Sequence, residues 1–280
     1  MDLSSGKLTS LVLESKLSHR TIKLINSYHE NFFLSGSFLM YPWVNRLSTD
    51  KIEFEEKNFL IDPILKDETG KPIHGLYFRT TRVIQGDIQI SEEFIEVIIR
   101  PEKFHPEFPE FIEKYILKTN SIEVELEFSN RTDNSQYFSV GFHPYIQLEN
   151  SIENIVILSN LTHSIRLEES LLPKRKDMEE LKNLFPIELG KKQLDHSFYS
   201  ENKNVFVKLI DKISGDSVLF ESLEKEIPLN YFQFYTPPDR TSIAIEPMSS
   251  VGDVFANPIS KPIKLLPKET KSCGFKITLE

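Results

Sequence analysis

The chain has 280 residues, including 21 phenylalanines and only 10 glycines, and its formal net charge at pH 7 is −9. A negative net charge disfavours nonspecific binding to nucleic acid or to an anionic membrane surface, and the sequence contains no basic run. The single cysteine, Cys273, excludes an internal disulfide framework and a cysteine-based zinc site. It favours a reducing compartment such as the cytoplasm, although a periplasmic protein with one cysteine would fit as well.

The sequence shows no targeting or membrane segment. Its first 20 residues lack the charged and apolar regions of a signal peptide, and no apolar segment approaches the roughly 18 residues of a membrane span. No internal repeat and no linker-like change of composition interrupts the chain. We therefore expect one domain over residues 1–280, with no nucleic-acid or membrane partner. Monomer and homodimer both stay open.

Strand-like segments recur from end to end, and polar turns separate them. Examples are residues 10–15, 20–26, 94–100, 114–119, 121–129, 154–160, 204–211, 241–247 and 275–280. One segment, residues 176–185, has apolar side chains at helical spacing (Met178, Leu181, Leu184 and Phe185), which predicts a short helix. Many strands with little helix indicate an all-β protein, either a sandwich or a barrel.

The segment VGFHPYIQL, residues 140–148, raises a functional question. It follows residues 121–129, whose strict apolar–polar alternation predicts a half-buried strand, and a second strand-like run at 137–142. Pro144 cannot donate to a sheet ladder and marks a strand end, an edge or a bulge. His143 would then lie at the rim of a sheet with its ring free to react. The alternative is a packed histidine that caps a strand.

Four further stretches carry polar residues that suit chemistry. They are MYPWVNRL with Asn45 and Arg46, IHGLYFR with His74, LDHSF with Asp195, and IAIEPM with Glu246 at the end of a buried strand. Each residue also has a purely structural interpretation: a surface ion pair for Arg46, a turn cap for His74, a loop hydrogen bond for Asp195, a solvated strand end for Glu246. Together with His143 the set suits acid–base work on a polar neutral molecule. Without a glycine-rich loop it does not suit a phosphate cradle.

The ordered set PWVNR, HGLYFR, GFHPY, LDHSF and IAIEPM resembles the aldose 1-epimerase (galactose mutarotase) family, over about residues 37–257. The segment LLPKETKSCGFKITL, residues 265–279, is similar to the family's closing strand, whereas residues 9–36 depart from the family's opening. The resemblance implies a large antiparallel β-sandwich, the galactose mutarotase-like supersandwich, with a few short helices. It also implies interconversion of the α and β anomers of a free sugar. We expect no metal or cofactor, because an acid–base pair suffices for this reaction and the motifs contain no H-x-x-H or H-E-x-x-H pair.

The resemblance implies a role for each motif residue. Glu246 corresponds to the general base and His143 to the general acid, whereas the other motif residues bind and orient the sugar: His74, Arg46, Asp195 and, as a further candidate, Asn45. Opening of a hemiacetal requires one group that accepts a proton and one that donates it, and we expect a carboxylate and an imidazolium on opposite sides of the sugar ring. Two alternatives remain: a carbohydrate-binding or regulatory module without turnover, and a mutarotase of sugar phosphates.

Overall fold

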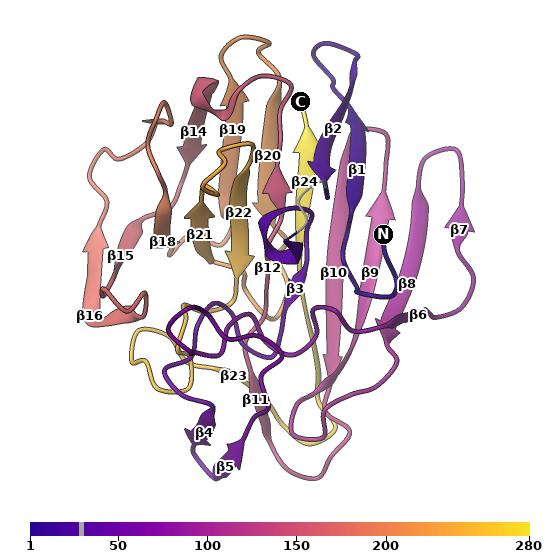
Figure 1. The fold of residues 1–280 in the computed structure, drawn as a ribbon. Helices are drawn as coiled ribbons and strands as arrows, with labels where there is room; N and C mark the ends of the chain where they lie inside the picture. The colour runs from indigo at the N-terminus through magenta and orange to yellow at the C-terminus, as the bar shows by residue number, and fades with distance from the viewer. Residues whose placement is uncertain (28–30) are drawn as a thin grey trace.

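The computed structural model describes residues 1–27 and 31–280, without the side chains of residues 175–177, and it consists almost wholly of antiparallel strands (Figure 1). Two large sheets account for most of them. The first has ten strands, in spatial order β17 (Ile187–Glu188), β14 (Ile155–Ser159), β19 (Phe206–Asp211), β20 (Ser217–Ser222), β24 (Thr270–Leu279), β10 (Ser121–Ser129), β9 (Glu110–Leu117), β8 (Ile95–Pro101) and β6 (Arg82–Ile84), with β7 (Gln89–Ile90) also on β8.

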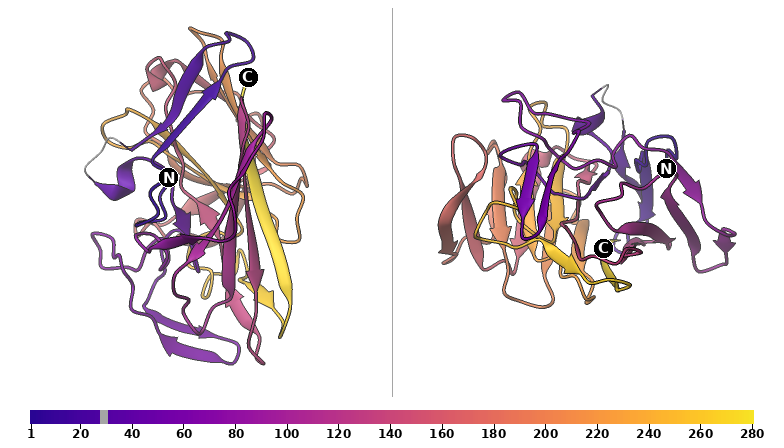
Figure 2. Two further views of the ribbon diagram at one scale, coloured as in Figure 1. Left: turned by 90° about the vertical axis from the view of Figure 1, so that its right-hand side faces the viewer. Right: turned by 90° about the horizontal axis from the view of Figure 1, so that it is seen from below.

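The second large sheet has eight strands. In spatial order these are β16 (Pro173–Glu180), β15 (His163–Leu167), β18 (Asp195–Tyr199), β21 (Tyr231–Tyr235), β22 (Ile243–Met248), β12 (Gly141–Phe142) and β3 (Leu39–Met40), and β13 (Tyr145–Ile146) also pairs with β22. The two sheets pack face to face as the layers of a sandwich (Figure 2). The expected all-β antiparallel β-sandwich is therefore confirmed.

Three two-stranded sheets and two short helical turns complete the described part of the chain. The small sheets pair β1 (Ser10–Glu14) with β2 (Thr21–Asn26), β4 (Lys51–Phe54) with β5 (Lys57–Leu60), and β11 (Gln136–Phe138) with β23 (Ile263–Leu265). The helical turns are the 3-10 segments η1 (Phe32–Leu34) and η2 (Ile152–Asn154). None of the helices among the described residues has the length and hydropathy that a bilayer span requires.

Strand β10 shows how the sequence pattern forms the sandwich. Ile122, Val124, Leu126 and Phe128 are buried in the core between the sheets, whereas the glutamates between them point outward, as the alternation predicts. On the outer face Glu125 forms ion pairs with Lys114 and Lys225. The core side chains include several large aromatic rings, which accounts for the high phenylalanine content.

The helix predicted over residues 176–185 is wrong. The segment enters strand β16, which ends at Glu180, and residues 181–186 form an irregular connection to β17. Met178 pairs with Ile165 of β15, and Leu184 is 38% exposed instead of joining an apolar helix face. The free backbone edge of β15 offers hydrogen bonds that a strand can use and a helix cannot. This pairing stabilises the strand more than the weak helical periodicity of the segment stabilises a helix.

Strand β22 is buried on both faces, and this places it at the functional region. Ile243 and Ile245 point into the core between the sheets, whereas Ala244 and Met248 join a second apolar cluster with Phe38 on the opposite face. Because side chains alternate along a strand, Glu246 also lies on that opposite face. The strand does not end at Glu246 but continues through Pro247 to Met248.

Candidate active site

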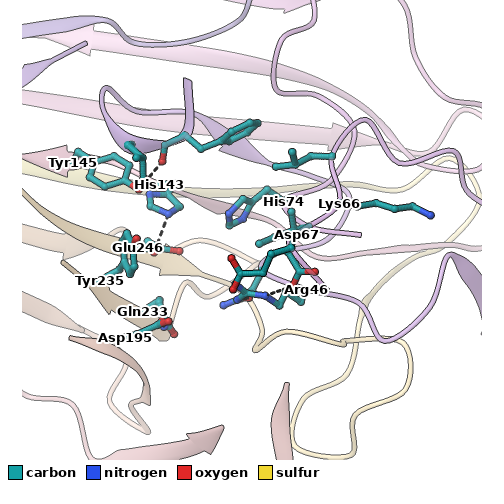
Figure 3. A pocket seen from close by; sticks show the side chains of 16 residues that line it. Arg46, Lys66, Asp67, His74, His143, Tyr145, Asp195, Gln233, Tyr235 and Glu246 are labelled. Carbon is teal, nitrogen blue, oxygen red and sulfur yellow. Dashed lines mark hydrogen bonds and ion pairs between the residues drawn. The ribbon is translucent and has the colours of Figure 1, made fainter. Parts of the chain in front are cut away.

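A cavity of about 300 Å³ opens on the face of the eight-stranded sheet that carries Glu246. Its volume is at the lower end of the range of roughly 300–1,000 Å³ usual for small-molecule sites. All six residues predicted from the sequence line it: Asn45, Arg46, His74, His143, Asp195 and Glu246. Figure 3 labels all of them except Asn45. The fold thus brings together residues from five separate stretches of the chain.

Three adjacent strands supply the polar floor of this pocket. In the register of β18, β21 and β22, Gln233 is paired with Glu246 on one side and with Ser197 on the other. Gln233 donates from Nε2 to Asp195 and accepts from the Ser197 hydroxyl, so both ends of its amide are held. Burial raises the pKa of Asp195, although Arg46 and the bond from Gln233 act in the opposite direction.

Gln233 is not among the residues predicted from the sequence. Its signal is a polar residue at the third position of YFQFY, on the face of β21 opposite to that of Phe232 and Phe234, which point into the core. The same alternation separates Asp195 from its neighbour His196, which faces away and is exposed.

His143 lies in the short break between β12 and β13, as the proline after it predicts. The backbone N–H of His143 donates to the Phe38 carbonyl at 2.9 Å, and its ring is stacked between Phe38 and Tyr145, with centroids 4.9 and 4.7 Å away. A glycine is needed at position 141, two residues before His143, because a Cβ there would lie 2.7 Å from Met248 Cγ. The ring is not free at a sheet rim, since the residue is only 5% exposed.

His143 and Glu246 are in direct contact: Nε2 and Oε1 are 3.1 Å apart (Figure 3). The expectation that they occupy opposite sides of a sugar ring does not fit this arrangement. Glu246 is 2% exposed, which also rules out a solvated strand end. His143 Nδ1 and Glu246 Oε2 are buried and have no hydrogen-bond partner among the residues that the structure describes, so the pair depends on this one contact.

Burial disfavours the charged form of both groups. It lowers the pKa of His143 to about 3, with the positive charge of Lys7 acting in the same direction. It raises the pKa of Glu246 above its ordinary value, reinforced by Asp195 and opposed by Arg46. Both directions favour a neutral carboxyl group that donates to a neutral imidazole. Both shifts therefore favour one shared proton in the pair over the expected imidazolium and carboxylate.

Asn45 and His74 come from two chain segments that run side by side. The His74 N–H donates to the Asn45 carbonyl at 2.9 Å, and both residues have positive φ, +49° and +63°. Residues other than glycine rarely adopt this backbone conformation, and such residues cluster at functional sites. Gly75 is required after His74, because a Cβ there would lie 2.1 Å from the Tyr41 carbonyl oxygen. Burial, His143 and Arg46 all lower the pKa of His74, so its ring is neutral.

Arg46 is held by two residues at the side of the pocket. Its Nε donates to Asp67 Oδ2 at 2.7 Å, and its Nη1 donates to Asn45 Oδ1 at 3.1 Å. Burial raises the pKa of Asp67, but hydrogen bonds from Thr69, Lys71 and Arg46 outweigh it and lower that pKa to about 2. Asp67 is thus an ionised anchor for Arg46. It is not among the residues predicted from the sequence.

Comparisons with known proteins place the chain by sequence and by fold. The sequence profile of the family described as Aldose 1-epimerase matches residues 6–278. No curated protein matches the chain by sequence.

Several solved structures share the fold. A galactose mutarotase-like protein from Clostridium acetobutylicum has a TM-score of 0.78 at 15% identity, covering 92% of this chain and 86% of its own. The GalM/aldose epimerase homologue from C. elegans has a TM-score of 0.73 at 11% identity, covering 99% and 94%. The galactose 1-epimerase from Lactobacillus acidophilus NCFM has a TM-score of 0.69 at 16% identity, covering 96% and 88%. At these identities the likeness shows the fold alone.

Proposed function

Because the chain belongs to the aldose 1-epimerase family, we propose that it interconverts the α and β anomers of a free, neutral aldose by general acid–base catalysis. The observation that carries the proposal is the 3.1 Å contact between His143 Nε2 and Glu246 Oε1 at the wall of a pocket of sugar size. A pair that shares one proton offers one acceptor and one donor, which is what ring opening requires.

Ring opening moves two protons at neighbouring oxygens. When the sugar enters, the shared proton passes from Glu246 to His143. The C1 hydroxyl then loses its proton to the Glu246 carboxylate, the C1–O5 bond breaks, and O5 gains the proton from the His143 imidazolium. Because O1 and O5 are bonded to the same carbon, two groups on one side of the sugar can reach both. On binding, the sugar exchanges the direct His143–Glu246 contact for bonds to its own oxygens. The open aldehyde rotates about C1–C2 and recloses on the other face with the two roles reversed.

The remaining polar residues are proposed to bind the sugar hydroxyl groups. Asp195 and Gln233 form one fixed hydrogen-bonding unit beside Glu246, and Arg46 presents a guanidinium that Asp67 holds in place. Groups whose positions are fixed before binding lose little entropy when the sugar arrives, and they hold C1 at the acid–base pair. Trp43 does not contribute a sugar-stacking face, since it is fully buried in the core.

The test is anomer exchange of glucose and of galactose at equilibrium, measured by NMR magnetisation transfer with and without protein. We expect exchange well above the spontaneous rate for at least one of these sugars. Sugar binding without any acceleration of exchange would instead favour a carbohydrate-binding module, since one fold can host either function.

The pH dependence of anomer exchange should be a broad bell. On the acid side activity falls only when His143 takes up a second proton, and burial holds that pKa at about 3. On the alkaline side activity falls when the last proton leaves the pair, and burial raises the pKa of Glu246 that governs this step. We therefore expect the exchange rate to persist well below the ordinary imidazole value near 6.5. An acid limb close to 6.5, in protein shown to be folded by circular dichroism, would contradict the shared-proton pair.

A sugar phosphate should be a poor substrate. Arg46 is already paired with Asp67, and the other lysine and carboxyl side chains of the pocket are those of Lys66, Glu68, Asp195 and Glu246. A phosphate dianion would enter a pocket with few unpaired positive groups. We expect kcat/KM for glucose 6-phosphate to be about tenfold or more below that for glucose. 6-O-methylglucose, which adds bulk without charge, is the control; faster exchange of the phosphate would favour a sugar-phosphate mutarotase.

A further inference from the structure

Lys7 is a buried ammonium group that the proposed mechanism does not use. The residue is only 3% exposed, and it forms no ion pair with any described residue. Its Nζ donates to the Phe32 carbonyl at 2.7 Å and lies 4.4 Å from the centroid of the Phe32 ring. Its methylene chain packs on Gly36, where a Cβ would lie 2.3 Å from Lys7 Cε. A buried lysine without a carboxylate partner is costly and calls for an explanation.

Lys7 is connected to the acid–base pair through a layer of aromatic rings. Phe32 and Phe33 each contact Phe38, with centroids 5.7 Å apart in both cases, and Phe38 is stacked on His143. Phe33 lines the pocket, and its carbonyl accepts from the Tyr145 hydroxyl at 2.6 Å on the other side of the His143 ring. The turn η1 that Lys7 holds is therefore a wall of the pocket.

The backbone of the same N-terminal segment is also fastened to this layer. Leu8 and Ser37 exchange two backbone hydrogen bonds of 2.8 and 2.9 Å, and the N–H groups of Tyr145 and His143 donate to the carbonyls of Gly36 and Phe38. Residues 36–38 thus lie between the strand break that carries His143 and the segment that carries Lys7. These bonds connect the segment of Lys7 to the strand break of His143 through three residues.

We propose that Lys7 is a positioning residue for the acid–base pair, which holds the η1 wall of the pocket and supplies a buried positive charge behind the His143 ring. The proposal rests on the proposed function for its meaning in catalysis. It also gives η1, which lies in the stretch 9–36 that departs from the family's opening, a part in the site.

The charge has a defined effect on the pair. The titratable groups that face His143 and Glu246 from the surrounding elements are His74, Arg46, Asp195, Tyr145, Tyr235 and Lys7. A cation nearby makes it harder for the pair to take up a second proton. Burial, reinforced by Arg79 and opposed by Asp2, lowers the pKa of Lys7 itself to about 8, so Lys7 is charged throughout the acid range.

The test compares Lys7→Met with wild type and with Lys16→Met, the same change at an exposed position of the same segment. In Lys7→Met we expect the acid limb of the anomer-exchange profile to move to higher pH by about 0.5–1 unit, because removal of a cation favours protonation. We also expect kcat/KM to fall by about tenfold, mainly through KM, because the η1 wall is released. A merely structural lysine would lower the thermal midpoint and leave the pH limb in place.

A second readout does not depend on activity: the ¹⁵N shifts of the His143 ring, followed against pH. His143 should begin to protonate at higher pH in Lys7→Met than in wild type or Lys16→Met. An acid limb and ring shifts equal to those of wild type, in folded Lys7→Met, would overturn the inference. If wild type does not exchange anomers, the proposed function fails, and the ring shifts still decide the electrostatic role of Lys7. Should Lys7→Met not fold, Lys7→Gln removes the charge and keeps a donor for the Phe32 carbonyl.

Discussion

Replacement of Glu246 by glutamine is expected to lower the rate of anomer exchange by about 10²–10⁴-fold, the usual contribution of one well-placed acid–base group. Glutamine keeps the shape of the side chain and one acceptor oxygen, so it can still contact His143 Nε2. It cannot take up or release a proton, and the pair then has no second member. The measurement is NMR magnetisation transfer between the α and β anomers at equilibrium.

Two controls separate lost chemistry from lost structure. Glu127→Gln makes the same change on an exposed position of β10, outside the pocket, and should leave exchange unchanged. Sugar binding should change less than turnover in Glu246→Gln, because Arg46 and Asp195 still hold the substrate. Exchange near the wild-type rate in folded Glu246→Gln would remove Glu246 from the mechanism and favour the binding-module alternative.

The double variant of Glu246→Gln with His143→Asn tests whether the two residues act as one unit. Groups that share a proton give losses that do not multiply, since removal of either one already abolishes the transfer. The double variant should therefore be little slower than either single variant. Losses that multiply would show two independent contributions instead.

The largest loss of stability is expected from Glu113→Leu. Arg82 Nε donates to Glu113 Oε1, the Tyr115 hydroxyl donates to Oε2 at 2.8 Å, and the Arg82 and Glu113 side chains are fully buried. Leucine fills similar space but leaves the guanidinium without its counter-charge. Removal of one partner of a buried pair costs about 3–5 kcal/mol of the free energy of unfolding. The loss is measured as the difference in the free energy of unfolding between Glu113→Leu and wild type in urea denaturation.

The control for this prediction is an exposed ion pair in the same sheet. Glu188 and Lys212 are 3.1 Å apart at the surface, and Glu188→Leu should change the free energy of unfolding by about 1 kcal/mol or less. The guanidinium of Arg82 also packs on Gly6, where a Cβ would lie 2.7 Å from its Cζ. An equal effect of the two substitutions would mean that the buried pair is not a determinant of stability.

The strands that the sequence predicted are those whose pattern agrees with their surroundings. Residues 121–129 alternate strictly, and β10 buries every second side chain in the core. Residues 176–185 show the limit of the same reasoning, because four apolar residues at helical spacing lie partly in a strand that pairs with β15. A local pattern does not contain the free sheet edge that the segment meets after folding.

The residues of the site were found by residue type and order, and their supporting partners were not. Asn45, Arg46, His74, His143, Asp195 and Glu246 stood in short motifs and line one pocket. Gln233 and Asp67 escaped notice because one lies in an aromatic strand and the other in an ordinary turn sequence. Their importance comes from partners far along the chain: Asp195 for Gln233, and Arg46 for Asp67.

By itself the sequence determined the all-β class, the family resemblance and the set of polar residues in the pocket, because these depend on residue type, spacing and order. Only the tertiary structure decided that His143 and Glu246, more than one hundred residues apart, touch each other. Their pKa values depend on how completely other strands exclude water and on which charges those strands bring close. Neither quantity exists until the sheets have packed, and for that reason the sequence predicted an imidazolium and a carboxylate, whereas burial in the fold favours the neutral form of each group.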